Sequence, residues 1–190
     1  MPPPRIDAAW VEWAVATHVS RYSSPRGHVE RLLRVRVRKA ERQGAEVPAD
    51  LDLWLRETLD KHVRLGTIDD AAWAENRARG LTRRGVSRSG VGQRLRERGI
   101  ANPAAALTVI AGELAAAAGP DEEAVSPDLI AACAWARRRR FGPFARSAGG
   151  ADAAKKALAA MGRAGFSWGV SKRVLEMELQ EAERLLERLR

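Results

Sequence analysis

The sequence is poor in cysteine, tyrosine and phenylalanine, with one, one and three of these residues in 190. A single thiol, Cys133, allows no internal disulfide and no cysteine-based metal cage, which suits a reducing compartment. The most apolar run, 104–118, is 15 residues long, contains Glu113 and is too short to span a bilayer. The N-terminal residues lead into a segment with Asp7 and Glu12 rather than into an apolar signal core. We therefore expect a soluble, cytoplasmic protein with no membrane partner.

Residue patterns that carry catalysis or hold cofactors are also missing from the sequence. His18, His28 and His62 show no metal-ligand spacing, and Cys133 has no obvious base partner. There is no glycine-rich phosphate loop with a lysine and no pair of catalytic carboxylates. The adjacent Asp69-Asp70 would diverge by about 100° on a helix, so helix capping is favoured over metal binding. We expect no enzyme and no cofactor.

Positive charge is what the sequence has in excess. Lys and Arg number 33 against 24 Asp and Glu, a net charge of +9, and only five of the 33 are lysine. Guanidinium groups bind phosphate bidentately, so this charge favours nucleic acid or its complexes as the partner ahead of an anionic membrane. A GC-rich genome that encodes arginine in place of lysine explains the ratio equally well. The genome explanation does not account for where the charges lie along the chain.

Helix signals recur along the whole chain, whereas alternating strand patterns are absent. Ser24, Asn102 and Ser126 each precede a proline, and Asp69 or Asp70, Ser87 and Ser167 are further predicted N-caps. Glycines are predicted to close helices at 44, 66, 85, 99, 119, 142 and 165. We predict an all-α protein with nine helices, at 7–22, 25–43, 48–65, 70–84, 88–98, 103–118, 127–141, 151–164 and 168–189. The last carries an apolar stripe of Leu175, Leu179, Ala182, Leu186 and Leu189.

The helices group into three similar sets. Asp-Ala-Ala-Trp occurs at 7–10 and again at 70–73, and the same shift of 63 aligns Ser24 with Ser87. A shift of 66 aligns Gly99-Ile100 with Gly165-Phe166. A period of this size indicates tandem units that bury their apolar faces on neighbours. We predict three helix-turn-helix-like repeats of three helices each, at 1–66, 67–119 and 120–190, the last with a C-terminal helix extension.

The six tryptophans are candidates for packing or for stacking on bases. Trp10, Trp73 and Trp135 follow small residues near the start of each repeat, which favours a role as core anchors. We expect Trp13, Trp54 and Trp168 to pack as well.

Charges are segregated within each repeat. Blocks 21–42, 77–98 and 137–173 are basic, and acidic blocks follow at 45–60, 113–128 and 176–187. If equivalent helices recur along one side, the basic blocks merge into a track that neutralises several phosphates; the alternative is that solvated helix faces happen to fall this way. The candidate partner or DNA contacts are Arg31, Arg34, Arg38, Arg83, Arg84, Arg88, Arg94, Arg98, Arg137, Arg138, Arg140, Lys155 and Lys156. Residues 137–140 span more than one helical turn, so their side chains cannot all reach one partner.

Four segments together resemble the RecX family of recombinase regulators. They read Gly-Thr-Ile-Asp-Asp-Ala-Ala-Trp-Ala at 66–74, Arg-Arg-Gly-Val-Ser at 83–87, Ala-Arg-Arg-Arg-Arg-Phe-Gly-Pro-Phe at 136–144 and Arg-Ala-Gly-Phe-Ser-Trp at 163–168. The likeness extends from about Trp10 to Leu175. No single segment is catalytic, and their order and spacing carry the resemblance.

The resemblance implies tandem three-helix repeats in an elongated, curved molecule. It also implies binding in the groove of the filament that the RecA recombinase forms on single-stranded DNA, with inhibition of strand exchange and ATP hydrolysis. We expect a monomer whose partners are this filament, its single-stranded DNA and, further, duplex DNA. The alternatives are a stand-alone helix-turn-helix-type DNA-binding protein and a repeat scaffold that binds an acidic protein without DNA.

Overall fold

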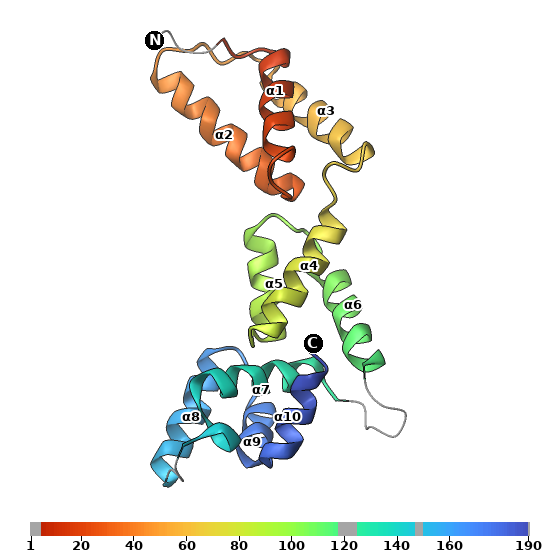
Figure 1. Ribbon diagram of the computed structural model, residues 1–190. Coiled ribbons are helices and arrows are strands. Elements are labelled where there is room, and N and C mark those ends of the chain that lie inside the picture. The colour runs from red at the N-terminus through yellow and green to blue at the C-terminus, as the bar shows by residue number, and fades with distance from the viewer. Residues whose placement is uncertain (1–4, 118–124, 147–149, 190) are drawn as a thin grey trace. The chain divides into compact units, whose positions relative to one another are not determined.

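The computed structural model describes residues 5–117, 125–146 and 150–189 (Figure 1). These ranges contain helices and no strand, so the predicted all-α class is confirmed. The helices are α1 (Ala8–Val19), α2 (Arg26–Arg42), α3 (Leu51–Arg64), α4 (Asp70–Arg83), α5 (Arg88–Glu97), α6 (Pro103–Ala116), α7 (Pro127–Arg139), the 3-10 turn η1 (Gly142–Phe144), α8 (Ala151–Arg163), α9 (Trp168–Glu176) and α10 (Leu179–Glu187). Within those ranges, no helix is both long enough and apolar enough to cross a bilayer.

The chain packs into two compact units. Unit 1 comprises Met1–Ala74 with Glu97–Ala101, and unit 2 comprises Glu75–Arg96 with Asn102–Arg190. The division into repeats at 1–66, 67–119 and 120–190 stays a prediction. The predicted glycine cap at 119, the boundary beside it and most of the acidic charge of block 113–128 lie outside the described residues.

The core of unit 1 is built by α1, α2 and α3, which pack on one another. Val11, Leu33 and Leu55 are fully buried in it, and Trp10 and Trp54 pack against its edge. These two tryptophans therefore have the packing role that the sequence predicts.

The core of unit 2 lies between α7, α8, α9 and α10, with η1 against α9. It contains Cys133, Met161 and Val174, all buried. Trp135 is half-buried and packs against Phe141 and Phe166, with ring centroids 5.5 and 6.3 Å away. The edge-to-face contact with Phe166 is a favoured aromatic geometry, so Trp135 anchors this core as predicted.

Most predicted helix caps are present. The side chains of Asp69, Ser87, Asn102, Ser126 and Ser167 accept hydrogen bonds from backbone amides in the first turns of their helices. The prediction for Ser24 is wrong. Its hydroxyl contacts His18 Nε2 at 3.0 Å instead, and α2 has no local side-chain cap.

The prediction of a single helix at 168–189 is also wrong, because the helix is interrupted between α9 and α10. Met177 and Glu178 adopt extended backbone conformations, with ψ of 145° and 147°. The break lets α10 fold back on α7, which buries Met177, Ala182 and Leu186 in the unit 2 core. The predicted stripe does not form one face, since Leu179 is 44% exposed.

Candidate nucleic-acid and partner interface

The candidate cations of α2 differ in their surroundings. Arg31 and Arg38 are exposed. The Arg34 guanidinium forms two ion pairs. Its Nη2 lies 2.9 Å from Glu30 of the same helix, and its Nη1 lies 2.8 Å from Asp52 of α3. The hydrogen bond to Glu30, then that to Asp52, raises the pKa of Arg34. The acidic block thus neutralises part of the basic block within unit 1.

Two histidines lie among the cations of unit 1. His18 and His28 are in ring contact, with centroids 6.3 Å apart. Burial, followed by the positive charge of Arg36, lowers the pKa of His18. Burial lowers the pKa of His28, and the charges of Arg98, Arg31 and His18 add to this effect. The candidate Arg98 is exposed and belongs to unit 1.

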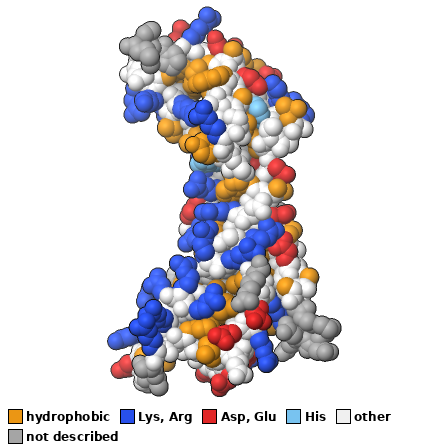
Figure 2. Space-filling model, viewed as in Figure 1, with side chains coloured by type: hydrophobic (Ala, Val, Ile, Leu, Met, Phe, Trp, Pro, Cys, Tyr) orange, Lys and Arg blue, Asp and Glu red, His pale blue; other side chains and the backbone are white. Residues whose placement is uncertain are grey.

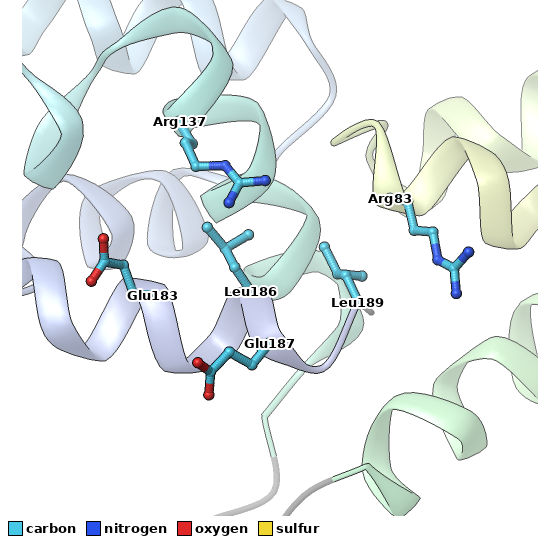
Figure 3. Close-up of a pocket in the computed structure, with 6 residues that line it drawn as sticks. All are labelled: Arg83, Arg137, Glu183, Leu186, Glu187 and Leu189. Atoms are coloured by element: carbon cyan, nitrogen blue, oxygen red, sulfur yellow. The ribbon is translucent and has the colours of Figure 1, made fainter.

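The basic ends of α4 and α7 meet in unit 2. Arg138 Nη1 donates to the backbone carbonyl of Arg84 at 2.8 Å. Arg83 and Arg137 line one hollow together with Glu183, Leu186 and Glu187 of α10 and with Leu189, which follows that helix. In Figure 3, the Arg137 side chain extends from α7 beside Leu186, while Arg83 extends from the end of α4. The structure thus brings together side chains from two basic blocks that lie about 50 residues apart in the sequence.

A glycine permits this meeting of α4 and α7. Gly85, with φ of +72°, follows α4, and a Cβ at this position would lie 2.4 Å from the backbone nitrogen of Trp135. Real Cβ atoms do not come so close to backbone atoms. The position therefore requires glycine for both its conformation and its contact.

The four successive arginines after Ala136 take four different environments. Arg137 lines the α10 hollow, and Arg138 bonds to the Arg84 carbonyl. The Arg139 guanidinium lies over the Trp135 ring, 5.6 Å from its centroid. Arg140 lines a different hollow beside α8. Whether they contact one partner stays a prediction, but their surroundings within the protein differ.

The remaining candidates of unit 2 are exposed. They are Arg88, Arg94, Lys155 and Lys156. Figure 2 shows Lys and Arg side chains gathered over α5, α7 and α8, while several Asp and Glu side chains lie over α10. Another acid, Glu113 of α6, is paired with Arg79 of α4. Unit 2 thus presents a basic surface. That this surface continues through the basic block 21–42 of unit 1 stays a prediction.

Two tryptophans do not pack as the sequence predicts. Trp13 is 62% and Trp168 is 69% exposed. Lys172 lies over the Trp168 ring, with Nζ 5.3 Å from the centroid. Trp168 is the first residue of α9, where the side chain lies at the end of the helix rather than between helices. The exposed Trp168–Lys172 pair is therefore a candidate contact, and it favours the stacking alternative that the sequence left open for this tryptophan.

Metal-ligating side chains do not gather in the part of the chain that the structure describes, where no group of three His, Cys, Asp or Glu is found. Cys133 is buried, and its Sγ lies 3.9 Å from Met177 Sδ. Burial, with the charge of Glu181 adding to it, raises the pKa of the Cys133 thiol to about 12. The thiol is therefore protonated at neutral pH and packs as an apolar group.

The fold defines an all-α protein whose unit 2 presents a basic surface. Sequence relatives name the family. The chain is 31% identical over 175 residues to the regulatory protein RecX of Myxococcus xanthus, covering 92% of this chain and 88% of that protein. It is 34% identical over 119 residues to the regulatory protein RecX of Agrobacterium fabrum, covering 63% of this chain and 57% of that protein. The chain belongs to the RecX family. No family model matches it, and no solved structure matches it either.

Proposed function

We propose that this protein regulates the RecA recombinase, mainly as an inhibitor. It binds in the groove of the filament of RecA on single-stranded DNA and lowers strand exchange and ATP hydrolysis. The similarity to a regulatory protein RecX over 92% of the chain carries this proposal. The protein acts by binding and without chemistry of its own, as a cytoplasmic monomer.

The charge distribution supports a filament as the partner. Exposed arginines at the α4 and α7 ends, and along α5, offer phosphate contacts. Acids beside them, such as Glu183 and Glu187, disfavour DNA alone. A filament presents both DNA and protein surface, which suits a mixed surface of this kind. Duplex DNA is a further ligand of the same arginines.

The test is the rate of ATP hydrolysis by RecA on single-stranded DNA, with and without this protein. Suppression at less than one copy per RecA subunit is the expected result, since a bound molecule that bridges neighbouring subunits affects more than one. An unchanged rate, together with tight and sequence-selective duplex binding by the protein alone, would refute the proposal and favour a stand-alone DNA-binding protein.

A further inference from the structure

Unit 2 carries a second hollow, between the end of α7, η1 and α8. It encloses about 530 Å³. Its apolar lining, called the floor below, includes Phe141, Ala154, Ala157 and Leu175. Because several of these side chains are alanine, a partner's larger apolar side chains can approach the backbone closely. We call this hollow the Arg140 groove.

The rim of the Arg140 groove is cationic. Arg140, Arg146 and Lys156 line it, and no Asp or Glu is among its lining residues in the described part of the chain. This distinguishes it from the hollow at Arg83, where two glutamates lie beside the arginines. An apolar floor bordered by these positive side chains fits a ligand that is apolar at its centre and acidic at its edges.

Arg140 has a backbone conformation that is unfavourable for arginine. Its φ is +59° and its ψ is +49°, at the C-cap of α7. Every other described residue with positive φ is a glycine. The left-handed conformation is sterically unfavourable for side chains with a Cβ, and glycine is the usual residue at such helix ends. The chain therefore keeps a cation at the groove rim at a position where glycine would be more stable.

The groove is formed in the folded unit before any partner binds. Gly142 lies so close to α9 that a Cβ on it would be 3.0 Å from Leu175 Cα. This contact holds η1 against α9 and fixes the Phe141 and Leu175 sides of the floor. A preformed apolar site binds without the entropic cost of ordering its own walls.

We propose that the Arg140 groove binds an acidic amphipathic segment of a partner protein. Apolar side chains on one face of the segment lie on the floor, and flanking carboxylates pair with Arg140, Arg146 and Lys156. A strand of nucleic acid fits less well, because base stacking uses aromatic platforms. Phe141, the one aromatic residue among the described lining residues, already packs against Trp135.

This inference goes beyond the proposed function and does not depend on it. It assigns Arg140 and Lys156 to a protein contact, whereas Arg83, Arg84 and Arg137 are proposed to face the filament and its phosphates. The experiment therefore contains no recombinase, and its failure would leave the RecA proposal standing.

The probe is a fluorescein-labelled helical peptide with leucines along one face and glutamates along the other. The control probe has the same composition in scrambled order. The measured quantity is fluorescence anisotropy with the full chain. We expect saturable binding of the amphipathic peptide and affinity at least about tenfold lower for the scrambled one, because only the first can place apolar groups on the floor while its acids reach the rim.

Two variants test the location of binding. Ala154→Glu adds a carboxylate to the apolar lining of the groove and should weaken binding about tenfold or more. Ala159→Glu makes the same change at an exposed position of α8 that does not line the groove, and should bind like the unaltered protein. Arg140→Gly should keep or raise the melting temperature, because glycine suits a positive φ, yet weaken peptide binding.

The proposal is overturned if both peptides bind equally, which would show attraction by charge alone. It is also overturned if Ala154→Glu and Ala159→Glu bind alike, or if Arg140→Gly leaves affinity unchanged. Displacement of the peptide by a thymidine oligonucleotide whose own affinity falls in Ala154→Glu would instead identify a nucleic-acid site.

Discussion

The backbone amide of Arg88 donates a hydrogen bond to the carboxylate of Asp128, with N and Oδ1 2.6 Å apart. The amide of Arg26 makes the same contact with Asp70 at 2.7 Å. In both cases the acid lies in the first turn of one helix and caps the N-terminus of another. Asp128 of α7 caps α5, and Asp70 of α4 caps α2. These caps fix long-range packing through groups that a helix N-terminus leaves unpaired.

Removing either acid should destabilise the fold. We expect Asp70→Ala and Asp128→Ala each to lower the free energy of unfolding by about 1 kcal/mol, as for other lost N-caps. Urea denaturation measures this change. The matched control is Asp50→Ala, since Asp50 stands at the N-cap of α3 without a side-chain cap bond. An equal loss in all three variants would show that the tertiary caps add nothing.

Gly85 should tolerate no side chain. Gly85→Ala brings a Cβ against the Trp135 backbone and also imposes a left-handed conformation, so we expect a loss of several kcal/mol, roughly the upper range for single substitutions. Gly44→Ala is the control, because Gly44 has φ of +92° but nothing within 4 Å of the added Cβ. That variant should lose only about 1 kcal/mol. Similar melting temperatures for the two variants would contradict the close contact.

The stability of the protein should decrease as the pH falls from about 7.5 to 5.5. Folding lowers the pKa of His18 and of His28 from the usual 6.5. Below that value the unfolded chain therefore binds more protons than the folded one, and protonation favours unfolding. The double variant His18→Gln, His28→Gln should show a weaker decrease in its urea midpoint over the same range. An unchanged slope would mean that other groups cause the pH dependence.

Reversing exposed arginines of unit 2 should reduce filament binding without unfolding the protein. We expect the double variant Arg84→Glu, Arg94→Glu to suppress RecA ATP hydrolysis much less, and binding to become less sensitive to salt because fewer phosphates are neutralised. Its melting temperature should stay close to that of the unaltered protein. Arg56→Glu, an exposed reversal on α3, is the control. Parallel loss of fold and binding in the double variant would show a structural role for these arginines.

Trp168 should contribute to single-stranded DNA binding because it is exposed and carries the cation Lys172 beside its ring. Trp168→Ala should weaken binding of a thymidine oligonucleotide by about 1–3 kcal/mol, the usual value for one stacked base. Trp168→Phe should recover part of this loss. Fluorescence quenching and anisotropy measure the affinities. Equal binding by the alanine variant and the unaltered protein would exclude a stacking role.

Local signals in the sequence were sufficient to predict most helix ends. Asp69, Asn102 and Ser126 cap helices within three residues of themselves, so the interaction is contained in the pattern that predicts it. Gly44, Gly66 and Gly165 have positive φ where helices stop, and a backbone preference is likewise local. The all-α class follows from the sum of such signals.

Contacts between residues distant in the sequence decided the helix ends that these local patterns could not predict. Ser24 has the sequence of a cap, but α2 is capped by Asp70, 44 residues away from Arg26. The 168–189 segment has a helical pattern throughout, yet burying Met177 and Leu186 against α7 breaks it. Local propensity is a small free energy per residue, and burial of apolar side chains outweighs it.

The candidate interface likewise depends partly on the sequence and partly on contacts made in the fold. The sequence by itself determined that arginines are abundant, which blocks carry them and that successive arginines of one helix point in different directions. Only the tertiary structure decided that Arg34 is neutralised by Asp52, that Arg84 and Arg138 meet, and that Arg140 borders an apolar groove. The physical reason is that the environment of a charge is set by whatever folding places within a few ångströms, wherever those atoms lie in the chain.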